Sequence, residues 1–486
     1  MNSPLNYLHQ QPPMDPNKNQ ILPNVKTIHL IAICGTGMAA LAVMLKDLGY
    51  QITGSDRNIY PPMSTFLSDH GIPIIEGFDA ANLDRHPDLV IVGNAITRDN
   101  PEAVRLDELG LFYCSMPQAV NHFLANNKKM LVVTGTHGKT TTSSLLAWLL
   151  YAAGLDPSFM IGGILQNFNS NHRLGNGEFV VIEGDEYDTA FFDKGPKLLH
   201  YRPHSAIITG VEFDHADIFT DLSHVMDAFG RFLNGLPDHC QVFAFDGDEN
   251  TARLIEARPA IVKKYGLQPG SAWRLGSTAI ENGWNNFEIF KGPSVFGRFR
   301  IRMAGRHNLL NTLAAVAVAD RLGITPTVIA DALESFSGIR RRQEVRGIKN
   351  NITVIDDFAH HPTAVAETIG AIRSHYPDGR LIAVFEPRTN TSMRNVFQKT
   401  YSEVFDSADI VCIRAPSLLH KVPPDQQFSS QKLVNDLVHR KKDAHHFSGT
   451  GKIIDYLVGT AVSGDVVLVM SNGGFDNIHE RLIKRL

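Results

Sequence analysis

The sequence predicts an α/β protein with several domains, each built on a largely parallel sheet. Short apolar runs alternate with helix-like stretches along the whole chain, which is typical of parallel α/β domains. Many of these runs end in a glycine-rich or acidic turn, and such sheets bind ligands at these strand ends. The chain has 486 residues, more than one domain usually holds. We place three domains at 1–125, 126–338 and 339–486.

The first domain begins with an apolar strand over 27–34, a glycine-rich turn and a helix over 38–48. The turn has the spacing Gly35-x-Gly37-x-x-Ala40, and Asp56 ends the next strand. This order matches the Rossmann dinucleotide fingerprint, in which the helix start holds a pyrophosphate. The same geometry fits NAD or the diphosphate of a nucleotide-linked sugar. The fingerprint therefore predicts a Rossmann-like domain with a diphosphate site, without specifying its chemistry.

The second domain begins with a strand over 130–134 and a phosphate loop. The loop reads Gly135-Thr136-His137-Gly138-Lys139-Thr140, with Val133 where the full eight-residue pattern has a further glycine. Its backbone N–H groups would face phosphates, Lys139 would reach the terminal phosphates, and Thr140 would bind Mg²⁺. A chance Gly-Lys-Thr turn is disfavoured, because a strand precedes the loop and a threonine-rich helix follows it. We therefore predict a P-loop ATP-binding domain with a parallel sheet.

Two later strands of this domain end in polar turns that could serve a metal ion. Glu183 follows one strand and His215 follows another. Oxygen ligands are preferred by Mg²⁺, and a turn histidine can equally make a structural hydrogen bond. The acidic neighbours of His215 favour the functional interpretation; they are Glu212, Asp214 and Asp217. Zinc is a weaker alternative, because no other His or Cys stands at ligand spacing.

Asn308 and Asn311 lie three residues apart before an alanine-rich helix over 311–322. Amide side chains at this place can read an adenine edge, or they can cap the helix. The residues alone favour capping. An alternating strand over 298–303 precedes them.

Four apolar strands in the third domain predict that this domain, too, has a Rossmann-like fold. Arg388 and Arg394 follow one of these strands, where they could pair with carboxylates or simply be surface arginines. The strands are 352–355, 381–385, 410–414 and 466–470.

Composition excludes several classes of protein. The net charge is −4 and the pI about 6.6, so no basic field for nucleic acid is expected. The four cysteines are scattered, which suggests reduced thiols and a cytoplasmic location. Residues 1–20 are polar and unlike a signal peptide, and we expect them to be frayed. No apolar run is long enough for a membrane helix.

Taken together, these motifs resemble those of the Mur ligases of peptidoglycan synthesis, in the order of that family and over nearly the whole chain. They are Gly-Thr-His-Gly-Lys-Thr-Thr at 135–141, Glu-Gly-Asp-Glu at 183–186, Asp214-His215-x-Asp217, Gly305-Arg306-His307-Asn308-x-x-Asn311, Arg340-Arg341-Arg342 and Asp356-Asp357-x-x-His360-His361-Pro362. The resemblance implies an ATP-dependent ligase that forms an amide bond through an acyl phosphate. It also implies a cytoplasmic enzyme, which we expect to be monomeric.

Within that family the chain is similar to the branch that acts on UDP-N-acetylmuramate. It most resembles the recycling ligases whose acceptor is the tripeptide L-alanyl-γ-D-glutamyl-meso-diaminopimelate. The alternative is a ligase that adds L-alanine, whose turns at 386–388 and 471–474 typically differ. Several Mur ligases use a carbamylated lysine, but this chain has no lysine between Lys197 and Lys263. The segments that indicate this branch are 33–36, 60–65, 186–193, 213–219, 386–391 and 470–475.

The resemblance also implies a role for each motif. The UDP-N-acetylmuramate site would comprise Gly35, Thr36, Gly37, Met38, Ser55, Asp56, Asn94 and Thr97. The ATP site would comprise Gly135, Thr136, His137, Gly138, Lys139, Thr140, Thr141, Asn308, Asn311, Arg341, Arg342 and Asp357. Mg²⁺ would rest on Thr140, Glu183 and His215, and the catalytic residues would be Lys139, Glu183, His215, Arg342 and Asp357. The tripeptide would meet His361, Arg388 and Asn472. Whether Arg341 or Arg342, and His360 or His361, acts is left open.

Overall fold

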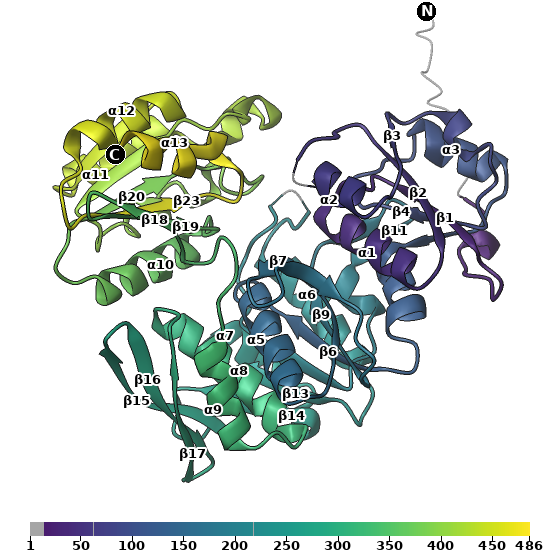
Figure 1. Cartoon of the computed structure of the whole chain (residues 1–486), viewed down its shortest axis with the longest axis horizontal. Coiled ribbons are helices and arrows are strands. Elements are labelled where there is room, and N and C mark those ends of the chain that lie inside the picture. The colour runs from purple at the N-terminus through teal and green to yellow at the C-terminus, as the bar shows by residue number, and fades with distance from the viewer. Residues whose placement is uncertain (1–13, 62, 217) are drawn as a thin grey trace, which may run out of the picture. The chain divides into compact units, whose positions relative to one another are not determined.

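The computed structural model describes residues 14–61, 63–216 and 218–486, and Figure 1 shows its elements. Expectations for the first 13 residues, for Pro62 and for Asp217 lie outside the described residues. The chain forms two compact units, and the predicted α/β class with parallel sheets is confirmed. The first unit comprises Met1–Lys128 and Tyr187–Tyr201, and the second comprises Lys129–Glu186 and Arg202–Leu486.

The first unit contains a five-stranded parallel sheet in the order β3-β2-β1-β4-β5. The chain runs from β1 to β2 and β3 on one side of β1, and β4 and β5 then follow on the other side. The switch point of this sheet therefore lies between β1 and β4. The strands are β1 Thr27–Ile31, β2 Gln51–Asp56, β3 Ile74–Glu76, β4 Leu89–Val92 and β5 Tyr113–Ser115. The helices are α1 Thr36–Asp47, α2 Met63–Asp69, α3 Pro101–Glu108 and α4 Met116–Ala119.

The segment Tyr187–Tyr201 belongs to the first unit, although our boundary at residue 126 placed it in the second. It forms the short antiparallel strands β10 (Asp188–Ala190) and β11 (Asp193–Pro196). The side chain of Ala190 is buried in the core of this unit, and the ring of Phe192 lies 4.7 Å from that of Tyr113. Contacts of this kind join residues far apart in sequence, so local patterns do not predict them.

The second unit contains a ten-stranded sheet in which β6, the strand before the phosphate loop, is central. The strands β12 and β9 flank β6, and both are parallel to it. Beyond β14, the antiparallel strands β15, β16 and β17 extend the sheet. Of these three strands we had predicted only one, over 298–303. The strands are β6 Lys129–Thr134, β7 Ser158–Leu165, β8 Ser170–Arg173, β9 Phe179–Gly184, β12 Ser205–Ile208, β13 Gln241–Phe245, β14 Val262–Gly266, β15 Trp273–Glu281, β16 Trp284–Lys291 and β17 Ser294–Ile301.

Three helices of this part, α5, α8 and α9, pack on one another and share one apolar core with the sheet. The helix α8 begins at Arg306, five residues before the expected start, with Gly305 as its N-cap at a φ of 93°. The capping role favoured for Asn308 and Asn311 is therefore wrong, because both side chains lie inside the helix. The helices are α5 Lys139–Ala152, α6 Leu222–Gly235, α7 Glu249–Ile255, α8 Arg306–Arg321 and α9 Pro326–Ser335.

The remainder of the second unit is built on a six-stranded sheet in the order β18-β19-β23-β20-β21-β22, parallel except for β18. Apolar side chains alternate along its buried strands, so each face of the sheet has its own core. The strands are β18 Glu344–Lys349, β19 Ile352–Asp357, β20 Leu381–Phe385, β21 Ile410–Arg414, β22 Asp443–Phe447 and β23 Val466–Met470. The helices are α10 Pro362–His375, α11 Ser430–His439, α12 Thr450–Thr460 and α13 Ile478–Arg485.

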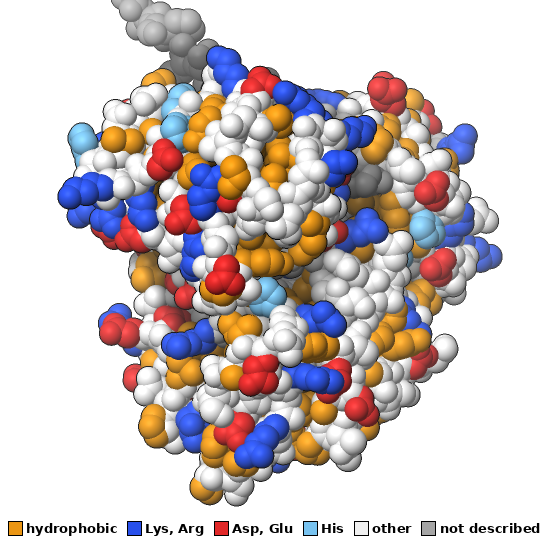
Figure 2. Space-filling model, turned by 60° about the vertical axis from the view of Figure 1, so that its left-hand side comes forward, with side chains coloured by type: hydrophobic (Ala, Val, Ile, Leu, Met, Phe, Trp, Pro, Cys, Tyr) orange, Lys and Arg blue, Asp and Glu red, His pale blue; other side chains and the backbone are white. Residues whose placement is uncertain are grey.

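Among the described residues, no helix combines the length and the apolar character that crossing a membrane requires. On the face of the molecule in Figure 2, acidic and basic side chains are interspersed with neutral and hydrophobic ones.

Candidate active site

The phosphate loop connects β6 to α5, at the centre of the ten-stranded sheet. Gly135 and Gly138 have φ angles of 125° and 80°, a region of backbone conformation that residues other than glycine rarely adopt. A Cβ atom at Gly135 would overlap Thr209, and one at Gly138 would lie 2.5 Å from Asn311 Oδ1. These two glycines therefore let the loop follow a tight path against β12 and α8.

Lys139 Nζ lies 2.7 Å from Glu186 Oε2, and both side chains are largely buried. Burial lowers the pKa of Lys139, but the charges of Glu186 and Asp185 raise it above its usual value overall. Burial raises the pKa of Glu186, but the nearby Lys139 charge and His215 bring it down to about 2. The sequence motif contains Glu186, yet we had assigned it no role.

His215 also contacts Glu186, with 3.3 Å between Nε2 and Oε1. Burial lowers the pKa of His215, but the hydrogen bond and charge of Glu186 raise it above the usual value overall. The residue has a φ of 54°, so the turn after β12 bends sharply at this point. Glu186 thus joins two of the predicted catalytic residues, Lys139 and His215.

Thr140 and Glu183 provide adjacent oxygen atoms beside the phosphate loop. Thr140 Oγ1 lies 3.3 Å from Glu183 Oε2, and the other carboxylate oxygen accepts a 2.7 Å hydrogen bond from Gly162 N. Burial, and after it the charge of Asp185, raises the pKa of Glu183. A hydroxyl and a half-buried carboxylate are suitable donors for Mg²⁺, whose charge would offset the cost of desolvating the carboxylate.

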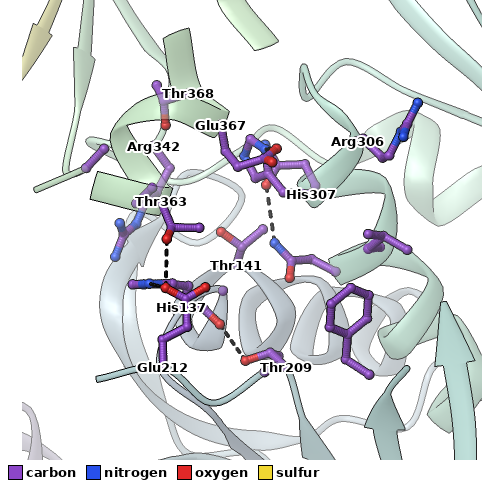
Figure 3. A pocket seen from close by; sticks show the side chains of 18 of the residues that line it. His137, Thr141, Thr209, Glu212, Arg306, His307, Arg342, Thr363, Glu367 and Thr368 are labelled. Carbon is purple, nitrogen blue, oxygen red and sulfur yellow. Dashed lines mark hydrogen bonds and ion pairs between the residues drawn. The ribbon is translucent and has the colours of Figure 1, made fainter. Parts of the chain in front are cut away.

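A pocket of about 260 Å³ opens next to the loop within the second unit (Figure 3). Its walls come from the phosphate loop, the start of α8, the end of β19 and the start of α10. The predicted ATP residues that line it are His137, Gly138, Thr141, Asn308, Asn311, Arg342 and Asp357. The lining that we had not predicted includes Thr209, Glu212, Phe245, Tyr265, His307 and Gln343.

The two asparagines at this pocket form a chain of polar contacts inside α8. Asn308 Nδ2 donates to Ala304 O at 2.8 Å, and Asn311 Nδ2 lies 3.4 Å from Asn308 Oδ1. Asn311 Oδ1 approaches Gly138, so its amide is held against the phosphate loop. Both side chains are buried next to the pocket, where an amide can donate to and accept from an adenine edge.

The neighbouring arginines 341 and 342 point to different places. Arg342 Nη2 lies 3.5 Å from Thr140 Oγ1, its guanidinium covers the ring of Phe358, and it lines the pocket. Arg341 instead donates to Ser471 O and Gly473 O at 2.5 and 2.7 Å. Burial lowers the pKa of Arg342 below its usual value, so a nearby phosphate would be a favourable partner.

Asp357, at the end of β19, organises the loop that follows it. Its carboxylate accepts hydrogen bonds from Gln343 N at 2.8 Å and from Ala359 N at 2.7 Å. Three residues after Asp357, His360 is half-buried and its ring contacts the carbonyl of Phe358 at 3.0 Å.

His361 is the N-cap of α10, and its ring meets the phosphate loop. His361 Nδ1 lies 3.1 Å from His137 Nε2 and accepts a hydrogen bond from Thr363 N at 3.3 Å. Burial, together with the His137 charge, lowers the pKa of His361 to about 4. The structure thus places His361 beside His137, a residue predicted for ATP, whereas we had predicted His361 for the tripeptide site.

The C-terminal ends of the adjacent strands β20 and β23 bring two distant turns together. Ser471 Oγ donates to Glu386 Oε2 at 2.7 Å, and Arg388 lies so close to Gly473 that a Cβ atom there would overlap it. The Arg388 side chain is about one third exposed (35%). Asn472 lies between Ser471 and Gly473, whereas Arg394 is tied to Gln426. A partly exposed guanidinium, 3.8 Å from the buried Glu386, therefore lies where these two turns meet.

In the first unit, the glycine-rich turn lies at the switch point of the sheet, with Gly35 as the N-cap of α1. Asp56 Oδ2 accepts a 2.9 Å hydrogen bond from Cys34 N and so braces the turn from β2. The hydroxyl of Ser55 is buried and donates to Glu102 at 2.7 Å, and the Ser55 carbonyl accepts hydrogen bonds from Ala32 N at 2.9 Å and Ile33 N at 3.1 Å, so Ser55 supports the turn from the interior. Thr36, Gly37 and Met38 form the first turn of α1.

A second cavity, of about 720 Å³, lies within the first unit beyond the end of β4. Asn94 and Thr97 line it, as do the rings of Tyr113, Phe191 and Phe192. Two of these rings come from the segment Tyr187–Tyr201, which the sequence did not assign to this unit. The cavity combines an amide, a hydroxyl and aromatic faces, which suits a ligand with both polar and apolar surfaces.

Three family models cover most of the chain. The Mur ligase family catalytic domain matches residues 27–128, the Mur ligase middle domain 133–319 and the Mur ligase glutamate ligase domain 341–473.

Similar proteins match over nearly their full length. The UDP-N-acetylmuramate–L-alanyl-γ-D-glutamyl-meso-2,6-diaminoheptandioate ligase of Escherichia coli K12 is 39% identical, over 94% of this chain and 98% of that protein. The Haemophilus influenzae ligase of the same name is 39% identical, over 95% and 99%. The UDP-N-acetylmuramate–L-alanine ligase of Clostridium tetani is 31% identical, over 92% and 96%.

Solved structures of similar ligases also match the chain. The murein peptide ligase of Psychrobacter arcticus is 32% identical, with a TM-score of 0.70 over 95% of this chain and 98% of that one. The UDP-N-acetylmuramate–alanine ligase of Thermotoga maritima is 25% identical, with a TM-score of 0.77 over 95% and 99%. The chain therefore belongs to the Mur ligase family, whose members are ATP-dependent ligases.

Proposed function

We propose that this protein joins UDP-N-acetylmuramate to the tripeptide L-alanyl-γ-D-glutamyl-meso-diaminopimelate and converts ATP to ADP and phosphate. The observation that carries this choice of acceptor is the close contact of Arg388 with Gly473. It joins the two turns, 386–388 and 471–474, that the family resemblance associates with tripeptide ligases. The two relatives at 39% identity, which carry the name of this reaction, also support it.

The proposed reaction proceeds in two steps, because a carboxylate is a poor electrophile. In the first step the muramate carboxylate oxygen attacks the γ-phosphorus of ATP, which forms an acyl phosphate and releases ADP. In the second step the amine of the tripeptide attacks the acyl carbon, the C–O bond to phosphate breaks, and the amine loses a proton. Lys139 and Arg342 would stabilise charge on the transferred phosphoryl group, since both are cationic and lie at the loop.

We propose that Mg²⁺ binds to Thr140 and Glu183, whose oxygen atoms lie 3.3 Å apart, with His215 as a further ligand. When bound, the ion would neutralise negative charge on phosphoryl oxygens. Glu186 would hold Lys139 and His215 in position for their roles, because its carboxylate contacts both.

We assign the remaining predicted residues to the substrates. UDP-N-acetylmuramate would bind to the first unit, with its pyrophosphate at Gly35–Met38 and with Asn94 and Thr97 in the adjoining cavity. The adenine would meet Asn308 and Asn311. The tripeptide carboxylates would meet Arg388 and Asn472, because a guanidinium binds carboxylates in a bidentate geometry.

The test is a direct comparison of acceptors. The protein is incubated with ATP, Mg²⁺ and UDP-N-acetylmuramate, together with either the tripeptide or L-alanine, and the products are weighed by mass spectrometry. We expect the UDP-N-acetylmuramoyl tripeptide and stoichiometric ADP release that requires both UDP-N-acetylmuramate and the acceptor. A product that forms with L-alanine and not with the tripeptide would overturn the proposal.

A further inference from the structure

We propose that His137, Glu212 and His361 form a binding site for one transition-metal dication, with Zn²⁺ as the best match. The residues come from the phosphate loop, the segment after β12 and the N-cap of α10. The distances are 3.1 Å from His137 Nε2 to His361 Nδ1, 3.5 Å from His137 Nε2 to Glu212 Oε2 and 3.6 Å from His361 Nδ1 to Glu212 Oε2. The three donor atoms thus converge on one point.

This triangle has the size that zinc requires. A point equidistant from three atoms with these separations lies about 2 Å from each, which is the usual Zn–N and Zn–O distance. Two imidazoles and one carboxylate form a common zinc ligand set, whereas Mg²⁺ prefers oxygen donors throughout. The site shares no donor with Thr140 and Glu183, so it is distinct from the proposed Mg²⁺ site.

Neighbouring groups already orient two of the three ligands. His361 Nε2 lies 3.2 Å from the carbonyl oxygen of Phe213, so the ring proton belongs on that nitrogen. A bound ion would take the lone pair of Nδ1 in place of the 3.3 Å hydrogen bond from Thr363 N. Thr363 Oγ1 donates a 2.7 Å hydrogen bond to Glu212 Oε2, a contact that Figure 3 shows beside His137. A zinc-bound histidine usually has a carbonyl or carboxylate partner on its second nitrogen.

An ion can reach the site from solvent. The side chains of His137 and Glu212 are 30% and 39% exposed, and both line the pocket beside the loop. Three protein ligands leave a fourth position open for water or for an anionic ligand. A bound ion would tie the phosphate loop to α10, and so it would stabilise the folded second unit.

The test uses Co²⁺, which replaces Zn²⁺ and absorbs visible light. The metal-free, tag-free full chain is titrated with Co²⁺ in the presence of excess Mg²⁺. We expect one Co²⁺ per chain with the intense visible bands of a four-coordinate site, loss of these bands when Zn²⁺ is added, and a Zn²⁺-dependent rise in Tm. A wild-type protein that shows only the pale spectrum of six-coordinate Co²⁺ would overturn the proposal.

Variants locate the ion. His361→Asn retains an N-cap residue and Glu212→Gln retains the shape of the side chain, so both are expected to fold, which circular dichroism checks. Each should weaken Co²⁺ binding at least about tenfold. His307→Ala is the matched control, because His307 pairs with Glu367 in the same pocket and stands outside the triad. Unchanged Co²⁺ bands in both triad variants would show that the ion binds elsewhere and would overturn the assignment.

Discussion

Lys139 and Glu186 form an ion pair of 2.7 Å in the interior of the second unit, where their side chains are 12% and 2% exposed. The attraction between two buried charges is largely offset by the cost of removing both from water, so such a pair is weak evidence for stability. Its position suggests a functional reason, because the other oxygen of Glu186 lies 3.3 Å from His215. We therefore regard Glu186 as the residue that positions Lys139 and His215.

Glu186→Gln should lower kcat by about 10–100-fold, the usual effect of losing a group that orients a metal ligand. The pH profile distinguishes this role from a structural one. Burial lowers the pKa of His215 while Glu186 raises it, so loss of the Glu186 charge should lower that pKa. If His215 must be neutral to bind Mg²⁺, the acidic limb of kcat/KM will move to lower pH in the variant.

The matched control is Glu178→Gln, since Glu178 forms an exposed pair of 2.8 Å with Lys129. Steady-state ADP release between pH 5.5 and pH 9 measures both variants. A Glu186→Gln enzyme with a lower kcat and an unmoved acidic limb would contradict the link to His215.

Arg342→Ala should reduce kcat about 10³-fold, because an arginine that stabilises a transferred phosphoryl group typically contributes this much. Arg342 is half-buried next to Thr140, whereas Arg341 is bound to the carbonyls of Ser471 and Gly473. Arg340→Ala is the control, since Arg340 is exposed and contacts Asn169. Near-normal turnover of Arg342→Ala would transfer the role to another residue, with Arg341 as the first candidate.

The strongest parts of the site could be predicted because they are local in sequence. The phosphate loop combines a strand, two glycines, Lys139 and a helix within about a dozen residues, and its backbone geometry follows from that pattern. The four strands predicted in the third domain match β19, β20, β21 and β23, since buried parallel strands are apolar runs with polar ends, whereas the edge strands β18 and β22 were missed. The start of α8 was missed, because Arg306–Leu310 carries no capping side chain that marks it.

Residues that act through long-range contacts could not be predicted. Glu186, Glu212 and the His137–His361 contact depend on how separate elements pack, and no spacing in the sequence brings them together. Zinc was considered only for His215, and the cluster proposed here could not be found from spacing because its residues stand at 137, 212 and 361. Likewise, the cavity lined by Phe191 and Phe192 requires the segment Tyr187–Tyr201 to join the first unit.

His361 predicts a pH dependence of stability. Its pKa is lowered to about 4 in the folded protein by burial and by His137, against about 6.5 for an unfolded chain. Above pH 6.5 the ring is neutral in both states, so its contribution is fully present. As the pH falls from 6.5 to 4 only the unfolded chain takes up the proton, and up to about 3 kcal/mol of unfolding free energy is lost.

His361→Asn removes this titration while it keeps a residue that can cap α10. Urea unfolding of the second unit, followed at several pH values between 4 and 7.5, should therefore show a shallower loss of stability in the variant. His420→Asn, at a site whose ring lies away from this pocket, should behave as the wild type does. Equal slopes for His361→Asn and the wild type would show that His361 does not contribute.

Arg388 should determine the affinity for the tripeptide and leave the other substrates unaffected. Its guanidinium is about one third exposed, it is held against Gly473, and it stands 3.8 Å from the buried Glu386. Loss of a hydrogen bond to a charged group costs about 1.5–3 kcal/mol, so Arg388→Ala should raise the KM for the tripeptide roughly 10–100-fold. The KM values for ATP and UDP-N-acetylmuramate should stay near those of the wild type.

Arg394→Ala provides the comparison, because Arg394 lies on the same stretch of chain but is engaged with Gln426. If Arg388→Ala raises all three KM values together, Arg388 supports the fold of this domain and another surface receives the tripeptide.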